Sequence, residues 1–269
     1  MQPLAAWPVA DRAGLIGVFT DIDDTLTTEG AITPDALQAL ADLAAAGLHV
    51  IPITGRPVGW SEPFARDWPV DAIVAENGAV ALVHEPPRGL HKLYTQDTAT
   101  RERNYQRMQQ VAARIVREVP GASLAQDSPG RETDIAIDHS EFTHLPQDRI
   151  DRVVALMREE GMTATVSSIH INGWFGQHDK LAGARWIVRE LLQRDLEAEL
   201  HRWAYVGDST NDVRMFEHFA HSVGVANIRR FEAQLAHKPR YVTQGERGAG
   251  FAEVARAVLA ARRVMPPAD

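Results

Sequence analysis

Short apolar segments alternate with amphipathic helical patterns at both ends of this chain, and that alternation limits the fold more than any other feature of the sequence. One helical pattern begins at Thr33-Pro34 and ends near Gly47, and another begins near Leu181. Apolar segments that favour β-structure lie beside them at 15–20, 48–54, 71–76, 203–206 and 221–226. Strands and helices in this order favour a parallel sheet that helices cover on both faces. The sequence therefore predicts a doubly wound, Rossmann-like α/β core.

The middle of the chain has a different pattern. Apolar residues recur at helical spacing over 101–119 and 150–157, whereas residues 133–138 alternate between apolar and polar side chains. The Asn172-Gly173 pair predicts a hairpin turn. Helices mixed with antiparallel strands indicate an α+β domain inserted into the first one. The expected division is a catalytic core of residues 1–83 and 179–269 with an inserted cap domain of residues 84–178.

Composition excludes several classes of protein. The 269 residues include no cysteine, so disulfides, thiolate zinc sites and cysteine nucleophiles are impossible. The formal net charge of −8 argues against a nucleic-acid partner. No run of about 18 apolar residues occurs, so we expect no membrane span, and the first 20 residues lack the pattern of a secretion signal. We expect a cytoplasmic protein of unknown oligomeric state.

Three polar clusters follow predicted strands. Asp21-Ile22-Asp23 follows the first strand, Thr54-Gly55-Arg56 the second, and residues 207–212 the strand near 203–206. Each cluster alone has an ordinary explanation, since aspartate, threonine and glycine commonly cap helices and form turns. Ligands of open α/β sheets bind at the carboxyl ends of the strands, so the three clusters are expected to meet at one edge. Lys180, at the start of the returning helix, is expected to reach the same edge.

These motifs resemble those of the haloacid dehalogenase superfamily. The match consists of Asp21-x-Asp23-x-Thr25, then Thr54, then Lys180, and finally Gly207-Asp208-x-x-Asn211-Asp212, in that order. The size, position and texture of the insert resemble the large α/β cap of the sugar-phosphate branch, which includes sucrose-phosphate and mannosyl-3-phosphoglycerate phosphatases. The resemblance implies the doubly wound core with an inserted cap and a phosphoric monoester hydrolase activity.

The resemblance also implies residue roles. Asp21 is the expected nucleophile, forming an aspartyl-phosphate, and Asp23 the expected general acid and base. Thr54, Gly55 and Lys180 would bind the phosphoryl oxygens, and Asn211 would orient Lys180 or Asp208. The expected cofactor is Mg²⁺, a hard cation that prefers oxygen ligands. Its ligands would be Asp21, Asp208 and, through the backbone carbonyl, Asp23, and Asp212 would complete or brace the metal shell.

Four further residues are candidates for substrate binding. Asn77 follows the third strand, Arg131 follows a turn in the insert, and Trp174 and His178 flank the return from the insert to the core. Each also has a structural reading: a turn residue for Asn77, a salt bridge for Arg131, and packing or surface decoration for the other two. The eleven histidines lack the spacing of a zinc site.

The sequence thus favours a Mg²⁺-dependent phosphatase of a small phosphorylated metabolite, a sugar or polyol phosphate. Asp23 favours phosphate esters over dehalogenation, since dehalogenases of the family generally lack a carboxylic acid there. A phosphomutase on the same scaffold and a non-catalytic metabolite sensor remain alternatives. A nucleotide-sugar transferase that binds metal through D-x-D would leave Thr54, Lys180 and residues 207–212 unexplained.

Overall fold

The structure is a computed structural model that describes residues 1–265. Its central element is a six-stranded sheet in which every neighbouring pair runs parallel, as the alternation of strands and helices predicts. The strands in spatial order are β1 (Gln2–Pro3), β15 (Tyr241–Val242), β14 (His221–Gly224), β13 (Trp203–Gly207), β2 (Gly17–Thr20) and β5 (His49–Pro52).

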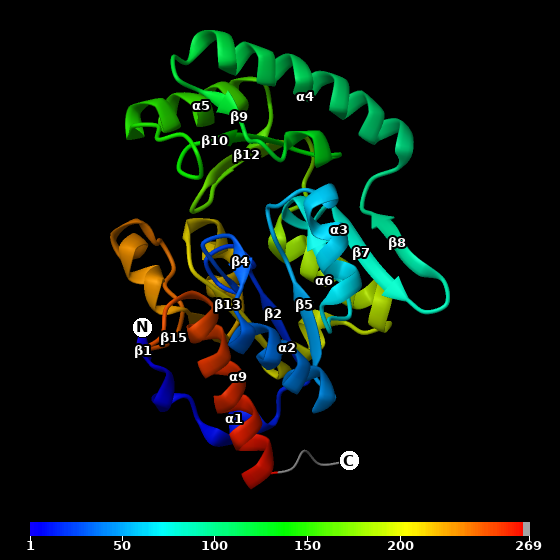
Figure 1. Ribbon diagram of the computed structural model, residues 1–269, viewed down its shortest axis with the longest axis vertical. Coiled ribbons are helices and arrows are strands. Elements are labelled where there is room, and N and C mark those ends of the chain that lie inside the picture. Colours follow the sequence, from blue (N-terminus) through cyan, green and yellow to red (C-terminus); the bar gives the residue numbers. More distant parts are fainter. Residues whose placement is uncertain (266–269) are drawn as a thin grey trace.

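Alternate residues of these strands fill apolar layers on both faces of the sheet. In β2, Val18 packs with one layer and Phe19 with the other, and both are almost fully buried. Helices α2 (Pro34–Ala45) and α9 (Arg247–Val264) cover the first face, and α6 (Lys180–Leu192) and α8 (Val213–His218) cover the second. Figure 1 shows α2 and α9 in front of the sheet, with α6 on the other side. The core is therefore doubly wound.

A three-stranded antiparallel sheet extends this core next to β5. It contains β6 (Ile73–Ala75), β7 (Val80–Glu85) and β8 (Gly89–Tyr94), and a parallel bridge from Ile53 to Val74 joins it to the chain after β5. Strand β8 was not expected from the sequence, and Pro86-Pro87 lies in the turn between β7 and β8.

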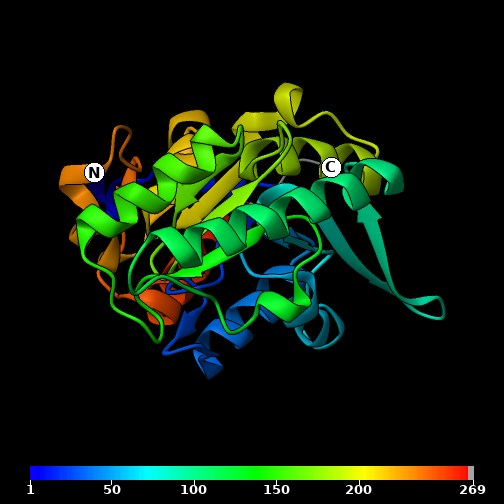
Figure 2. The same ribbon diagram turned by 90° about the horizontal axis from the view of Figure 1, so that it is seen from above.

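Residues from 98 to 174 form a separate layer above the core (Figure 1). Its four-stranded antiparallel sheet has the order β11 (Thr163–Val166), β12 (His170–Trp174), β10 (Ile135–Asp138) and β9 (Ser123–Leu124). Helices α4 (Thr98–Glu118) and α5 (Gln147–Glu159) contribute to a third apolar cluster with this sheet. Seen from above, the two helices lie across the molecule over the core (Figure 2).

The expected hairpin turn at Asn172-Gly173 is wrong. Both residues lie inside β12, where Asn172 is opposite Ala136 and Gly173 is opposite Ile135. Tertiary contacts override the turn tendency of the pair, because a Cβ at Gly173 would overlap the Met157 sulfur at 2.6 Å. The hairpin instead turns between β11 and β12.

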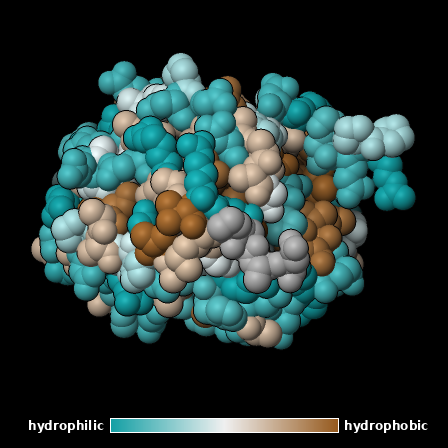
Figure 3. Space-filling view, turned by 90° about the horizontal axis from the view of Figure 1, so that it is seen from below, coloured by the Kyte–Doolittle hydropathy of each residue, from teal (hydrophilic) through white to brown (hydrophobic). Residues whose placement is uncertain are grey.

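The remaining β-strands and α-helices are short. They are β3 (Thr27–Thr28) paired with β4 (Ala31–Ile32), α1 (Val9–Ala13), α3 (Val58–Asp67) and α7 (Leu196–Glu199). None of the helices within residues 1–265 combines the length and apolarity needed to cross a membrane. The face away from the upper layer is largely hydrophilic, with small apolar groups (Figure 3).

The upper layer meets the core at several close contacts. The Cα of Gly130 in the layer would lie only 2.9 Å from a Cβ at Gly59 of α3, so the two backbones touch. The Thr210 hydroxyl donates to the Val166 carbonyl at 2.8 Å, and the Arg131 guanidinium donates to the Gly55 carbonyl at 3.0 Å. The carboxyl ends of β2, β5 and β13 therefore face a covered space.

Candidate active site

Asp21 lies directly after β2 and makes an ion pair with Lys180. The amide of Asp21 donates to the Val206 carbonyl at 2.9 Å, which ties the residue to neighbouring β13. One carboxylate oxygen lies 3.0 Å from the Lys180 ammonium, and both side chains are buried. Burial lowers the pKa of Lys180, but the nearby Asp21 and Asp212 carboxylates outweigh burial and raise it. Lys180 therefore carries a positive charge beside Asp21.

Asp212 fixes Lys180 from the other side. Its Oδ1 accepts from Lys180 at 2.7 Å and from the Tyr205 hydroxyl, and its Oδ2 accepts from the amides of Asp208 and Ser209 at 3.0 and 3.2 Å. Each oxygen thus already has two donors. This arrangement suits a residue that braces the loop after β13.

Asp208 has no positive partner among the described residues. Its carboxylate accepts from the Thr25 hydroxyl at 3.5 Å and from the Asn227 amide at 3.1 Å, which are neutral groups. Burial and the neighbouring Asp21 and Asp212 carboxylates raise its pKa well above the usual range. One carboxylate oxygen from each of Asp21, Asp208 and Asp212 lies within 4.8 Å of the others. Three buried carboxylates with a single ammonium group beside them form a set of oxygen donors that fits a divalent cation such as Mg²⁺.

Asp23 is not part of this acidic group and binds Arg56 instead. The Arg56 Nε lies 3.0 Å from both carboxylate oxygens of Asp23. Burial raises the pKa of Asp23, and the Arg56 guanidinium opposes that shift. Arg56 also contacts Glu141 at 2.7 Å and Asp127 at 3.2 Å, both from the upper layer. The side chains of Asp21 and Asp23 therefore lie in different surroundings.

Thr54 and Gly55 form the loop after β5. The buried Thr54 hydroxyl accepts from the Arg56 amide at 3.0 Å, and its carbonyl accepts from the Asn77 amide at 2.9 Å. A Cβ at Gly55 would lie 3.3 Å from side-chain oxygens of Asn77 and Asn172, so a residue without a side chain suits this position. The loop is held from the core and from the upper layer.

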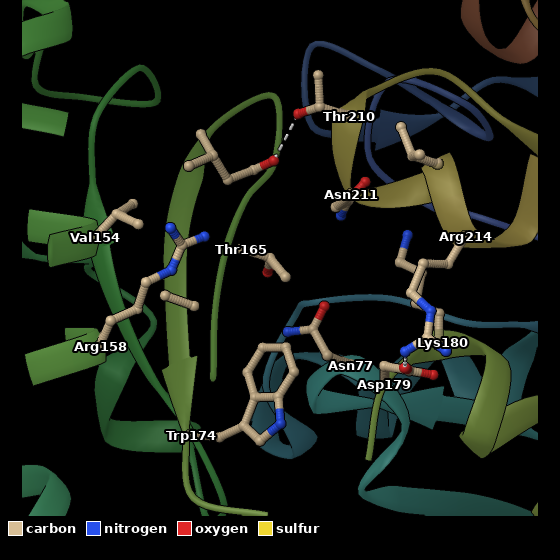
Figure 4. Close-up of a pocket in the computed structure, with 13 residues that line it drawn as sticks. Asn77, Val154, Arg158, Thr165, Trp174, Asp179, Lys180, Thr210, Asn211 and Arg214 are labelled. Carbon is tan, nitrogen blue, oxygen red and sulfur yellow. Dashed lines mark hydrogen bonds and ion pairs between the residues drawn. The ribbon is translucent and has the colours of Figure 1, made fainter. Parts of the chain in front are cut away.

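A cavity of about 320 Å³ lies between the core and the upper layer, with Lys180 in its wall. Asn77, Trp174 and Asn211 also line it, as Figure 4 shows. Asn77 adopts a positive φ of 55°, which asparagine tolerates well, and its side chain is buried. Arg158 and Thr165 line the wall that α5 and β11 provide. The cavity thus offers amide, hydroxyl, cationic and aromatic groups to a ligand.

Two other predicted residues, His178 and Arg131, do not line the cavity, and Asn211 lines it without a hydrogen bond to its expected partners. His178 stacks on Trp174 at a centroid distance of 5.3 Å and is not among the residues that line the cavity. Arg131 is buried in ion pairs with Asp134 at 2.7 Å and Asp127 at 3.1 Å. Asn211 accepts from the Ser209 hydroxyl at 2.9 Å, and its side chain has no hydrogen bond to Lys180 or Asp208 within residues 1–265.

Several residues near the site were not predicted as site residues. Asn227 donates to Asp208 and, at 2.9 Å, to the Asp24 carbonyl, which joins the loop after β14 to the loop after β2. Its place shortly after a predicted strand was the available signal. Arg56 stood in a recognised polar cluster but was given no role. Glu141 had no sequence signal, since it lies 85 residues from Arg56.

Comparisons with known proteins agree with this architecture. Residues 18–115 match the model of the haloacid dehalogenase-like hydrolase family. A comparison with curated proteins gave no match. A Thermoplasma acidophilum protein has a TM-score of 0.70 at 14% identity, over 91% of this chain and 98% of that one.

Two further solved structures share the fold across most of their length. Sucrose-phosphatase from Synechocystis, in complex with sucrose and phosphate, has a TM-score of 0.65 at 16% identity and covers 90% of this chain and 97% of its own. The C-terminal domain of trehalose-6-phosphate phosphatase from C. albicans has a TM-score of 0.64 at 14% identity, over 97% and 98% of the two chains. Residues 18–115 are thus similar to the haloacid dehalogenase-like hydrolase family, and the solved structures share the fold of this chain, with the motifs after β2, β5 and β13 at one edge of its doubly wound sheet.

Proposed function

We propose that the protein is a Mg²⁺-dependent phosphatase that hydrolyses a small phosphorylated metabolite, a sugar or polyol phosphate, through an aspartyl-phosphate intermediate. The observation that carries the proposal is the buried Asp21 carboxylate after β2, with the Lys180 ammonium 3.0 Å away and the Asp208 carboxylate nearby. A nucleophile beside a fixed positive charge suits phosphoryl transfer, where positioning and electrostatics supply most of the catalysis.

In the first step an oxygen of Asp21 attacks phosphorus, and the bond between phosphorus and the ester oxygen breaks. Asp23 gives its proton to the departing alkoxide. In the second step Asp23 takes a proton from water, the water oxygen attacks the aspartyl-phosphate, and Asp21 and inorganic phosphate are released. Lys180 and the Thr54-Gly55 loop bind the phosphoryl oxygens throughout.

Asp21 and Asp208 would hold the Mg²⁺ ion, with the Asp23 backbone carbonyl as a further ligand. Asp212 supports them from behind, because both of its oxygens already accept two hydrogen bonds. When bound, the ion would neutralise charge on the phosphoryl oxygens and orient them for in-line attack.

The upper layer is proposed to act as a cap domain, expected from the sequence to span residues 84–178. The pairing of β8 with β7 supports a boundary after Tyr94, since residues 89–94 belong to a sheet of the core. A covered cavity of about 320 Å³ with amide and hydroxyl groups supports a small polar substrate. Two structural neighbours, a sucrose-phosphatase and a trehalose-6-phosphate phosphatase, support a sugar phosphate as the substrate.

Phosphate release from p-nitrophenyl phosphate and from a panel of sugar phosphates tests the proposal. The wild-type protein is expected to release phosphate with Mg²⁺ and to stop when a chelator is added. Isomerised sugar phosphate with little free phosphate would indicate a mutase instead, and binding of a sugar phosphate without turnover would indicate a sensor.

A further inference from the structure

Arg56 joins the core to the upper layer at the expected general acid and base. The side chain is buried, and its Nε lies 3.0 Å from both oxygens of Asp23 in the core. Its Nη2 lies 2.7 Å from Glu141 in the upper layer. The guanidinium group is rigid and planar, so a partner that fixes one edge also fixes the other. The orientation of Asp23 therefore depends on a carboxylate from another part of the chain.

Glu141 is itself held on both sides. The Asp138 carboxylate at the end of β10 accepts from the four successive amides of residues 140–143 at 2.9–3.1 Å, which fixes the loop that carries Glu141. His170 at the start of β12 lies 2.7 Å from the second oxygen of Glu141. The Glu141 side chain is 19% exposed, so most of it is removed from solvent. Such support favours a defined position over a loose surface contact.

The upper layer provides no other carboxylate with this geometry within the described residues. Asp127 also contacts Arg56, at 3.2 Å, but it shares its oxygens with Arg131 at 3.1–3.3 Å. Glu141 makes the shorter contact, and Arg131 does not contact it. Glu141 is therefore the main anchor of Arg56 outside the core.

We propose that Glu141 is a positioning residue that orients Asp23 through Arg56, so that protonation of the leaving group depends on the upper layer being seated on the core. The inference rests on the proposed phosphatase function. When the upper layer lifts, Arg56 loses its outer anchor and Asp23 loses its fixed orientation. Only substrate that is bound beneath a seated upper layer then meets an Asp23 side chain in a fixed orientation.

The test compares two leaving groups in the full-length protein. An alkyl phosphate, such as a sugar phosphate turned over by the wild type, needs a proton on its departing oxygen, whereas p-nitrophenolate leaves without one. We expect Glu141→Gln to lower kcat for the alkyl phosphate by about 10- to 100-fold, part of the 10²- to 10⁴-fold that a positioned general acid provides. For p-nitrophenyl phosphate, the rate of the pre-steady-state burst of p-nitrophenolate, which reports the first step alone, should change by less than about threefold.

Glu132→Gln is the matched control. Glu132 also joins the upper layer to the core, with Lys92 at 2.9 Å and the Tyr94 hydroxyl at 2.7 Å, but these partners lie on β8 and away from Asp23. This variant should slow both substrates equally or not at all. In Glu141→Gln, an equal fall of the alkyl phosphate turnover and of the p-nitrophenolate burst rate would overturn the inference and leave Glu141 a structural contact, and so would unchanged kinetics.

Arg56→Lys provides a second variant. Lysine keeps the charge but loses the planar contact with Asp23, so the same selective loss on the alkyl phosphate is expected. Combining it with Glu141→Gln should add little further loss, because the two residues act in one chain of contacts. Independent, additive losses would contradict the claim that Glu141 acts on Asp23 through Arg56. Full activity of Asp21→Asn would instead contradict the phosphatase mechanism itself, so the two failures are distinguishable.

Discussion

Asp21 and Asp23 are two residues apart, yet their side chains lie in different kinds of surroundings. Asp21 is surrounded by groups of the core alone: Lys180, Asp208 and Asp212. Asp23 shares Arg56 with Glu141 and Asp127, which belong to the upper layer. The proposed nucleophile thus contacts the core alone, while the proposed general acid and base is linked through Arg56 to both the core and the layer above it. Under the proposed mechanism, attack on phosphorus would depend on the core, and protonation of the leaving group on the contact between the core and the upper layer.

The largest expected effect comes from the core side. Asp21→Asn removes the proposed nucleophile while keeping its size, so phosphate release should fall by more than about 10⁴-fold, the scale seen when a nucleophile is removed. The loss should be the same for alkyl and aryl phosphates, since both need the attack on phosphorus. Initial rates of phosphate release, and an acid quench that traps a hydroxylamine-sensitive phosphoenzyme, check this. Similar rates in mutant and wild type would remove Asp21 from the mechanism.

Asp23→Asn should have a smaller and more selective effect. We expect a loss of about 10²- to 10⁴-fold for an alkyl phosphate, the range for a general acid and base. The loss on p-nitrophenyl phosphate should be smaller, because only its second step needs Asp23. A pre-steady-state burst of p-nitrophenolate measures that difference. Equal losses for both substrates without a burst would show that Asp23, like Asp21, is needed in the first step whatever the leaving group. The proposed difference between the two aspartates would then be wrong.

Asp208→Asn tests the charge of the core cluster. Activity should fall by more than about 100-fold, because mutation of a residue that only hydrogen-bonds to a metal ligand already lowers metal affinity or activity by about 10- to 100-fold. Burial raises the pKa of the Asp208 carboxyl, so this group lowers folding stability as the pH rises above its unfolded pKa, and removing it should stabilise the metal-free protein at pH 7.

Thermal unfolding in chelator measures that stabilisation. The Tm of Asp208→Asn should exceed that of the wild type by about 2–4 °C, corresponding to about 1 kcal/mol in a protein of this size class. Added Mg²⁺ should raise the Tm of the wild type and leave that of the variant unchanged. A lower Tm for the variant in chelator would show that Asp208 stabilises the empty cluster.

The smallest effect is expected at His178, which belongs to neither set of contacts. Burial lowers its pKa to about 4, so it is neutral when folded, while the unfolded histidine gains a proton below pH 6.5. Stability from this site is therefore complete above pH 6.5 and is lost as the pH falls toward 4. On going from pH 7.5 to 5.5, the wild type should lose about 1 kcal/mol more than His178→Phe.

Urea unfolding at the two pH values measures this difference, with the exposed His144→Gln as control. The ratio of alkyl to aryl turnover should be the same in His178→Phe and the wild type. A changed ratio would show that His178 affects protonation of the leaving group by Asp23, contrary to its place outside both sets of contacts.

The core side of the site was predictable from the sequence because its determinants are local. Asp21, Thr54 and Asp208 each follow a strand, and parallel strands bring their carboxyl ends to one edge. Lys180 was placed by its position at the start of α6. The doubly wound class followed from the same alternation and is confirmed.

The side shared with the upper layer was not predictable, because its contacts join distant residues. No pattern near Glu141 indicates Arg56, and nothing near Arg131 indicates that its donors are taken by Asp127, Asp134 and the Gly55 carbonyl. Asn172-Gly173 illustrates the same limit, since its local turn tendency gives way to the packing of Met157. The periodicity of the sequence predicts where helices and strands lie. The side-chain contacts between the two layers join residues far apart in the sequence, so no local pattern predicts them.

The backbone contact between Gly59 and Gly130 makes the seating of the upper layer adjustable. A Cβ on either glycine would lie 2.9–3.2 Å from the Cα of the other, and Arg56 lies three residues before Gly59. Alanine and then valine at position 59 would act as spacers of increasing thickness, each holding the layer further from the core. The distance between Glu141 and Arg56 would then become a quantity that an experimenter sets in steps, without altering any charged residue.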